Sequence, residues 1–409
     1  MNAKDIAKLA RDASSYLLNV TEAQRTRALE EISKNIKSSV QIILNANALD
    51  IKDAIKHKLS DAMIDRLTLQ PKSIEALGDM CISVSKQECV VGFIVESYTR
   101  PNGLVIEKQR IPLGVIGMIF ESRPNVVVDG AALAIKSGNA IILKGGKEAQ
   151  HSNRILFDII SKSIKGILPE GSVSLIETRE DVSEILKLHE YIDLMVPRGG
   201  SALIQYVKEN ATMPVVAHDK GLCHLYVEKD AEISQVIPIV LNAKVQRPGV
   251  CNAIETLLLH KDYPENKKVL KALEDQKVEI RGCERTQELL PEIKLARPLD
   301  YHTEYQEKII SVKIVDGIDE AISHIHEHSS HHTEAILTKN PELIEKFLNS
   351  VDAAAVVINA STRFNDGGEL GLGAELGIST SKLHAYGPMG AKEMTTTRFL
   401  VKGNGQIRQ

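Results

Sequence analysis

A cysteine in a short loop is the residue of this sequence best suited to nucleophilic chemistry. Cys251 follows Pro248-Gly249, a pair that predicts a loop, and Arg247 lies just before that pair. A nearby cation lowers the pKa of a thiol, and the thiolate is the nucleophilic form. The alternative is a buried, inert cysteine, which is the commoner fate of a free thiol. Spacing alone leaves both alternatives open.

The other cysteines have no comparable setting. Cys223 lies beside His224 in a run that leads into a strand, which favours a packed thiol. The five cysteines are scattered and odd in number, which is not typical of a disulfide framework. A reduced, cytoplasmic protein is therefore expected. The five are Cys81, Cys89, Cys223, Cys251 and Cys283.

Polar segments follow three of the predicted strands, and two of these segments contain paired glycines. Paired glycines let a backbone approach a ligand closely, and Lys or Arg suits phosphate. In an open parallel sheet such strand ends bind ligands, so together they indicate a nucleotide site, although each alone is also an ordinary turn. No G-x-G-x-x-G fingerprint accompanies them, which argues against the usual dinucleotide phosphate turn. The segments are Glu121-Ser122-Arg123-Pro124-Asn125, Lys144-Gly145-Gly146-Lys147 and Pro197-Arg198-Gly199-Gly200-Ser201.

A histidine tract at 324–332 is the one segment that suggests metal ligands. It holds His324, His326, His328, His331 and His332. Alternate residues share a face only in an extended strand, whereas this context predicts a helix that ends in a loop. We therefore expect a solvated surface here and no metal site.

Helices and strands predicted from hydrophobic periodicity place these residues. Residues 21–56 carry apolar side chains at helical spacing, with Thr21 as the expected N-cap. After the turn at 101–103, short apolar strands alternate with helices, a pattern typical of a parallel sheet covered on both faces. The expected strands are 115–120, 140–143, 173–176, 194–196, 215–216 and 225–227.

A second α/β unit is expected to begin near residue 231. Its predicted elements are helices at 232–242 and 265–275 and strands at 255–259, 309–314 and 355–358. A glycine- and threonine-rich tail from 385 ends in a β-like segment at 396–401. The chain is thus predicted to be an α/β protein with two units and a tail.

Composition excludes several classes of function. The chain has 409 residues, a net charge of −4 and 43% apolar residues. This balance favours neither nucleic-acid nor membrane binding. No apolar segment is long enough to span a bilayer or to act as a signal peptide, so a cytoplasmic location is expected.

The order of these features resembles the aldehyde dehydrogenase superfamily. Four blocks are more specifically similar to its family of γ-glutamyl phosphate reductases, also called glutamate-5-semialdehyde dehydrogenases. The longest block, Ser361-Thr362-Arg363-Phe364-Asn365-Asp366-Gly367-Gly368-Glu369-Leu370-Gly371-Leu372-Gly373-Ala374-Glu375, is the most specific. The others are residues 119–126, 142–148 and 246–252, and the match extends over nearly the whole chain.

The resemblance implies NADPH-dependent reduction of γ-glutamyl phosphate to glutamate 5-semialdehyde through a thioester on Cys251. It implies a role for each matching residue as follows: Asn125 in the oxyanion hole; Lys144 and Gly145 at the adenosine ribose, where a 2′-phosphate also lies; Gly199, Gly200 and Ser201 over the cofactor; and Glu304 at the nicotinamide ribose. Because the substrate carries a carboxylate and a phosphate, Arg247, Arg363 and Gly368 are the expected substrate-binding residues.

One departure from hydrolytic aldehyde dehydrogenases is informative. Those enzymes carry a glutamate about thirty residues before the cysteine, as base for the attacking water. Here residues 215–221 read Val-Val-Ala-His-Asp-Lys-Gly, without a glutamate. Its absence suits a reductase, because water would waste the thioester. His218 lies near that place, and its role stays open.

The resemblance also implies domains and partners. We expect a cofactor-binding domain at 1–228 with a bridging hairpin at about 97–112, a catalytic domain at 229–384, and a tail at 385–409. Edge strands need a partner, which favours a homodimer or homotetramer. A separate glutamate 5-kinase is a possible transient partner. Two alternatives remain: an oxidoreductase of the same superfamily acting on another acyl phosphate, and a catalytically silent binding protein.

Overall fold

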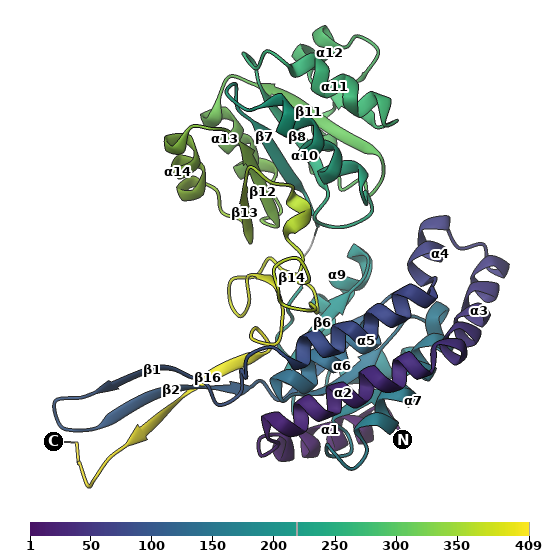
Figure 1. Ribbon diagram of the computed structural model, residues 1–409, viewed down its shortest axis with the longest axis vertical. Helices are drawn as coiled ribbons and strands as arrows, with labels where there is room; N and C mark the ends of the chain where they lie inside the picture. Colours follow the sequence, from purple (N-terminus) through teal and green to yellow (C-terminus); the bar gives the residue numbers. More distant parts are fainter. Residues whose placement is uncertain (218–219, 409) are drawn as a thin grey trace. The chain divides into compact units, whose positions relative to one another are not determined.

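The computed structural model describes residues 1–217 and 220–408 and divides the chain into two compact units (Figure 1). Unit 1 comprises Met1–Ala217, Gly371–Gly377 and Met389–Gln409, and unit 2 comprises His218–Leu370 and Ile378–Pro388. The division comes earlier than the boundary expected after residue 228. In the described chain, no helix has the length and apolarity needed to cross a bilayer.

Unit 1 begins with a group of helices, as the periodicity predicts. Thr21 caps the second helix with a capping box, and Ile32 and Ile36 are buried along its inner face. The apolar run at 21–56 is broken at Ser39 into two helices that meet at that residue. The helices are α1 (Ala3–Leu17), α2 (Glu22–Ser38), α3 (Val40–Lys56), α4 (Asp61–Leu67) and α5 (Pro71–Ser85).

A parallel sheet with the strand order β5-β4-β3-β6 forms the core of unit 1. Its strands are almost wholly buried because helices pack against them. Residues 215–216 were expected to be a strand, but Val215 forms only an isolated bridge to Met195. The elements are β3 (Val115–Phe120), α6 (Val126–Ser137), β4 (Ala140–Lys144), η1 (Lys147–Ala149), α7 (Gln150–Ile164), β5 (Val173–Leu175), α8 (Arg179–Ile185), β6 (Leu194–Arg198) and α9 (Ser201–Asn210).

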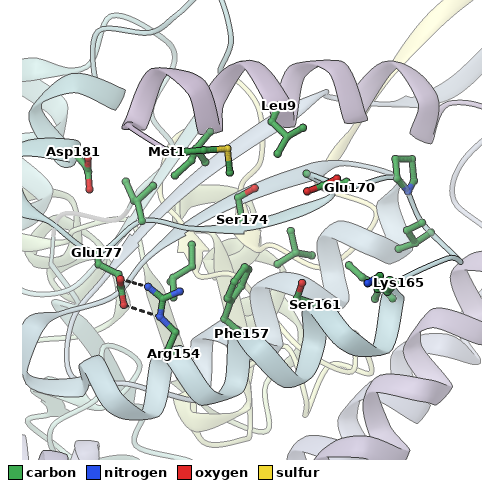
Figure 2. A pocket seen from close by; sticks show the side chains of 18 of the residues that line it. Met1, Leu9, Arg154, Phe157, Ser161, Lys165, Glu170, Ser174, Glu177 and Asp181 are labelled. Atoms are coloured by element: carbon green, nitrogen blue, oxygen red, sulfur yellow. Dashed lines mark hydrogen bonds and ion pairs between the residues drawn. The ribbon is translucent and has the colours of Figure 1, made fainter.

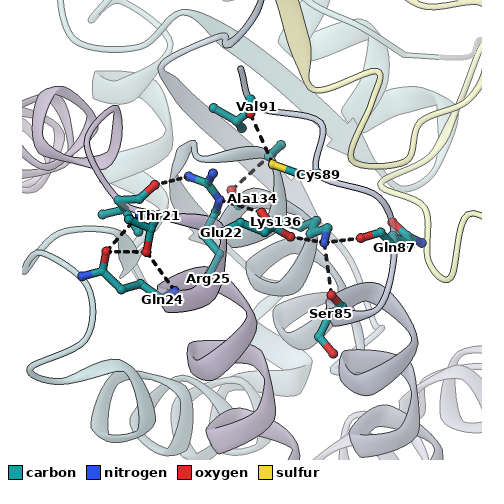
Figure 3. Close-up of polar contacts among 12 residues, drawn as sticks. Thr21, Glu22, Gln24, Arg25, Ser85, Gln87, Cys89, Val91, Ala134 and Lys136 are labelled. Carbon is teal, nitrogen blue, oxygen red and sulfur yellow. Dashed lines mark hydrogen bonds and ion pairs between the residues drawn. The ribbon is translucent and has the colours of Figure 1, made fainter. Parts of the chain in front are cut away.

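A buried lysine anchors the helix that follows Asn125. Lys136, in the last turn of α6, is fully buried and forms an ion pair with Glu22 of α2 (Figure 3). It also donates to the backbone oxygens of Ser85, at 3.1 Å, and Gln87, at 2.6 Å. These contacts hold the last turn of α6 to α2 and to the chain at the end of α5.

An antiparallel sheet of β1 (Ile94–Thr99), β2 (Val105–Pro112) and β16 (Thr395–Lys402) completes unit 1. The hairpin and the tail strand expected from the sequence both occur, and β16 pairs with β2 along its whole length. Every residue of β1 is exposed. In Figure 1 this sheet extends away from the helices of unit 1.

Unit 2 is built on a parallel sheet with the order β10-β9-β11-β8-β7-β12-β13. The prediction that residues 225–227 belong to the first sheet was wrong, because β7 hydrogen-bonds to β8 and β12. This pairing explains why unit 2 begins before residue 229. The strands are β7 (Cys223–Val227), β8 (Ile254–His260), β9 (Glu279–Gly282), β10 (Lys294–Leu295), β11 (Ile309–Val315), β12 (Thr333–Leu337), β13 (Ala355–Ile358), β14 (Ile378–Ser379) and β15 (Gly387–Pro388).

Helices of unit 2 cover this sheet, and two separate apolar clusters form its core. The first helix continues to Val245, beyond the predicted end at 242, and leads directly into the Cys251 loop. The helices are α10 (Ile233–Val245), α11 (Asn266–Asp275), α12 (Glu284–Leu289), η2 (Pro298–His302), α13 (Ile318–His328), α14 (Pro341–Ser350) and η3 (Thr362–Phe364).

Candidate active site

Cys251 lies in the loop between α10 and β8, at the amino end of the unit 2 sheet. The residue is partly exposed. Its backbone oxygen accepts a hydrogen bond from the Cys223 thiol, with 3.1 Å between sulfur and oxygen. Gly221 packs so closely that an added Cβ would lie 2.0 Å from that same oxygen. Cys251 is thus held through its backbone, in a loop that solvent reaches.

Arg363 packs against both sides of the Cys251 loop. Its guanidinium donates to Oδ1 of Asn252 and, at 3.0 Å, to Oε1 of Gln246. Burial is the main cause that lowers its pKa, and the Cys251 thiol is among the groups that oppose this shift. The structure therefore ties this arginine to residues on both sides of Cys251 rather than leaving it on a free surface loop.

Asn252 ties the segment that carries Arg363 to the cysteine loop. Its side-chain Nδ2 donates to the backbone oxygen of Asn365 at 3.0 Å, and its own backbone oxygen accepts from Thr362 Oγ1 at 2.6 Å. Sequence reasoning missed this residue. Its position next to the cysteine was the available signal, but partners more than a hundred residues away could not be inferred from it.

The other expected substrate-binding residues differ in their surroundings. Arg247 is exposed, and it lies close enough to Arg363 to lower the pKa of that guanidinium further. Gly368 is exposed, and its N–H donates to Oδ1 of Asp366 at 2.9 Å within a turn. A positive region beside the thiol is thus formed by the two arginines, while Gly368 is occupied in its own turn.

Cys223 is packed, as expected. It is fully buried, and burial raises its thiol pKa well above the usual value. The same holds for Cys81, where burial raises the pKa to about 12. Neither thiol has the ionised form that a nucleophile needs at neutral pH. His218, which lies near the place of the missing glutamate, is outside the described residues.

The histidine tract was expected to form a solvated surface, and this was wrong for two of its members. His324 and His332 are buried, whereas His326 and His331 are exposed. The helix α13 turns His324 inward, where it stacks on His328, with 4.3 Å between ring centroids. Among the residues that the structure describes, no group of three or more His, Cys, Asp or Glu side chains is arranged so that it could hold a metal ion.

Asn125 lies at the N-cap of α6 in unit 1, where Asp129 holds its side chain. Its Nδ2 donates to Oδ2 of Asp129 at 2.8 Å. Burial raises the pKa of Asp129 to about 6, although this hydrogen bond opposes the shift. The sequence analysis did not single out Asp129, but its spacing of four residues on a helix was a sufficient signal.

The three polar segments of unit 1, two of which contain paired glycines, meet at one edge of its sheet, as the prediction requires. They follow β3, β4 and β6, which are parallel neighbours. At this edge the Gly200 N–H, at the N-cap of α9, donates to the carboxylate of Glu121 at 2.8 Å. A side-chain anion thus already lies at a helix N-terminus, a position that suits a phosphate.

Two more of the residues expected to bind the cofactor, Lys144 and Ser201, lie at the same edge. An added Cβ at Gly199 would lie 2.3 Å from the Glu121 carboxylate, so a side chain there would displace the end of Glu121. Lys144 ends β4 and donates to the Gly145 oxygen at 2.9 Å. Ser201 begins α9. Glu304 belongs to unit 2, in the segment between η2 and β11.

A cavity of about 740 Å³ lies elsewhere in unit 1, along the edge strand β5 between α1 and α7 (Figure 2). Arg154 and Glu177 form an ion pair on its wall. None of the residues expected to bind substrate or cofactor lines it. A smaller pocket, lined by Gly145, Gly146 and Lys147, lies at the carboxyl ends of β4 and β5 and adjoins the expected cofactor site.

Comparisons with known proteins agree with this geometry. The sequence model of the aldehyde dehydrogenase family matches residues 1–286. A γ-glutamyl phosphate reductase from Nitratiruptor sp. is 48% identical, covering 98% of this chain and 99% of its own length. The chain belongs to the aldehyde dehydrogenase family, in its γ-glutamyl phosphate reductase branch. It is therefore an oxidoreductase.

Solved structures of family members support the fold. The crystal structure of γ-glutamyl phosphate reductase from Thermotoga maritima is 41% identical, with a TM-score of 0.95 over the whole of both chains. An acetylating aldehyde dehydrogenase from Geobacillus thermoglucosidasius has a TM-score of 0.73 at 16% identity, covering 100% of this chain and 97% of its own, and shares the fold. The predicted aldehyde dehydrogenase-like α/β fold is confirmed.

Proposed function

We propose that this enzyme reduces L-γ-glutamyl 5-phosphate to L-glutamate 5-semialdehyde and phosphate, as a step of proline biosynthesis. The names and full-length similarity of its relatives support the reaction. The observation that carries the proposal within the chain is the partly exposed Cys251 with Arg363 bound to the residues on both sides of it.

Cys251 is proposed as the nucleophile. Its thiolate attacks the acyl carbon, phosphate leaves, and a thioester forms on the sulfur. The neighbouring positive charge of Arg363 and Arg247 favours the thiolate and attracts an anionic substrate. Since Arg363 donates to Asn252 and Gln246, its charge is held in place before the substrate arrives.

Asn125 is proposed to donate to the oxyanion of the tetrahedral intermediate, together with the backbone N–H of Cys251. An amide nitrogen carries two N–H bonds. Asp129 accepts one of them and so fixes the amide plane, which leaves the second for the oxyanion. A donor of this kind is worth roughly 3–4 kcal/mol in comparable sites.

NADPH is the proposed cofactor. When bound, it supplies the hydride that reduces the Cys251 thioester to the aldehyde level. Lys144 and Gly145 would hold the adenosine ribose and its 2′-phosphate, while Gly199, Gly200 and Ser201 would lie against the diphosphate. Glu304 would hold the nicotinamide ribose. The Gly200 N–H at the N-cap of α9 already donates to the carboxylate of Glu121, which supports only that this N–H can face an oxygen anion.

Replacement of Cys251 by Ala or Ser tests the nucleophile. Oxidation of the semialdehyde, followed with phosphate and either NADP or NAD, is expected to fall by roughly 10³-fold or more, because the covalent route is lost. Cys89→Ser, at an exposed thiol in unit 1, is the control and should retain wild-type turnover. Near-native turnover of Cys251→Ala would refute the proposal, and a preference for another acyl phosphate would favour a different member of the superfamily.

A further inference from the structure

A buried ion pair spans the two ends of the Cys251 loop. Lys244 lies in the last turn of α10, before the loop, and Glu255 lies at the start of β8, after it. Both side chains are buried within unit 2, and Lys244 Nζ is 2.6 Å from Glu255 Oε2. One charge-assisted hydrogen bond therefore joins the residues that flank segment 245–254, which carries the Cys251 thiol.

The second oxygen of the same carboxylate holds another segment. Glu255 Oε1 accepts the backbone N–H of Gln306 at 3.3 Å. Gln306 has a φ of 56°, a left-handed backbone that side chains other than glycine rarely adopt. Such a conformation persists only where its surroundings impose it. Glu304, the proposed ribose-binding carboxylate, lies two residues earlier, so Glu255 contacts the segment that presents it.

Tyr305 adds a second link between this segment and the lysine. The Lys244 Nζ lies 6.0 Å from the centre of the Tyr305 ring, within the range of a cation–π contact. The Tyr305 hydroxyl is 2.9 Å from Ser311 Oγ on β11. Residues 304–306 are thus held from both sides, by the ion pair and by the strand that follows.

Stability alone is a poor reason for this pair. Replacing a buried ion pair with apolar residues is often neutral or stabilising, because desolvation of two charges is costly. That cost is visible here, since burial raises the pKa of Glu255 to about 7 and lowers the pKa of Lys244. Glu304 acts electrostatically on both members. These contacts point to a role of the pair in positioning two segments rather than in adding stability.

We propose that the Lys244–Glu255 pair is a positioning element which fixes the Cys251 loop and the Glu304 segment relative to each other within unit 2. Neither residue is proposed to touch substrate or cofactor. The inference rests on the proposed function in one respect, since it takes Cys251 as nucleophile and Glu304 as a cofactor-binding residue.

Two variants test the inference in the full-length enzyme. Lys244→Met with Glu255→Met removes both charges and the acceptor for the Gln306 N–H, and it keeps the side-chain lengths. Glu255→Asp keeps both charges but withdraws the carboxylate by one methylene, and it decides the question if the double variant does not fold. Leu258→Ala, buried on the same strand among the opposite apolar cluster, is the control for a loss of stability without a change at either segment.

Three measurements separate positioning from stability. They are kcat, the rate of alkylation of Cys251 by iodoacetamide, and the dissociation constant of NADPH from fluorescence. In both test variants we expect kcat to fall by about 10- to 100-fold, the alkylation rate to change at least about threefold and the dissociation constant to rise by about tenfold. Leu258→Ala should lower the melting temperature and leave all three values near those of the wild type.

The possible outcomes distinguish the inference from the proposed function. If alkylation of the wild-type enzyme leaves it active, the nucleophile assignment fails. If alkylation inactivates the wild type but the test variants keep wild-type kcat, alkylation rate and NADPH affinity, the positioning inference is overturned. If only the alkylation rate or only the NADPH dissociation constant changes, the inference that Glu255 holds both segments is also contradicted.

Discussion

At the scale of single residues, two of the proposed active-site side chains are held by neighbours that have no proposed part in the chemistry. Asp129 accepts a hydrogen bond from the Asn125 amide, and Asn252 accepts one from the Arg363 guanidinium. Preorganised donors stabilise a transition state most when they need not reorient during the reaction. These supporting residues should therefore affect kcat more than the binding of substrate or cofactor.

Asp129→Asn tests this expectation. The variant keeps the shape but no longer presents a charged acceptor to Asn125, so kcat should fall by about tenfold, against roughly 10²- to 10³-fold for Asn125→Ala. The dissociation constant of NADPH should stay near that of the wild type. Asp53→Asn, exposed on α3, is the matched control. Unchanged kcat in Asp129→Asn would show that Asn125 is oriented by other contacts.

The same variant has a defined effect on stability. Burial raises the pKa of Asp129 to about 6, above its ordinary value of 3.8, so the folded chain binds more protons than the unfolded chain between these values. The contribution of Asp129 to the free energy of unfolding therefore falls as the pH rises from about 4 to about 6. The free energy of unfolding, measured with urea, should rise in Asp129→Asn relative to the wild type by on the order of 1 kcal/mol as the pH is raised from about 4 to about 6.

At the scale of elements, α13 is a helix whose tertiary contacts could not be predicted from its own sequence. The helix was expected from the sequence, but the burial of its histidine was not. His324 packs edge-on against Tyr301, with 4.9 Å between ring centroids, and its buried Nε2 has no hydrogen-bond partner within the part of the chain that the structure describes. Such a ring must stay neutral, and burial lowers its pKa to about 2.

Acid should therefore weaken unit 2 through His324. Its folded pKa lies below the unfolded value of 6.5, so the unfolded chain takes up a proton first and stability falls as pH drops below about 6.5, by up to about 1.4 kcal/mol per pH unit. His324→Phe, which has no nitrogen to protonate, should reduce the slope of melting temperature against pH in this range. His326→Gln, exposed on the same helix, should not. An unchanged slope in His324→Phe would contradict the assignment.

At the scale of the whole molecule, the sheet of β1, β2 and β16 is the feature that points beyond one chain. Its outer strands β1 and β16 are edges, and edge strands tend to pair. Large apolar side chains are exposed along them, among them Phe93, Phe399 and Val401. We propose that this sheet joins subunits into a dimer or tetramer. The transient complex with glutamate 5-kinase stays a prediction.

Charge on this sheet should abolish assembly. In Phe399→Glu with Val401→Glu, two exposed apolar residues of β16 become acidic, so buried contacts with a second chain would be lost. Light scattering after gel filtration should give the mass of a dimer or tetramer for the wild type and of a monomer for the variant. Leu383→Glu, at a fully exposed position of unit 2, should keep the wild-type mass. A monomeric wild type would contradict the proposal.

The sequence by itself determined the kinds of element and the loops that carry the reactive groups. Helical spacing predicted α2 with its cap at Thr21, continuous apolar runs predicted β3, β4 and β6, and Pro248-Gly249 predicted the loop of Cys251. These predictions are correct because each depends only on periodicity and turn chemistry within a few residues. The resemblance to a known family then supplied roles that spacing alone left open.

Only the tertiary structure decided which distant segments meet. β7 was assigned to the wrong sheet because a buried parallel strand has the same apolar pattern in either unit. His324 is buried by residues that the local sequence does not contain, and Glu255 meets Gln306 across 51 positions. Such contacts are fixed by packing between elements, whose energy no local pattern encodes.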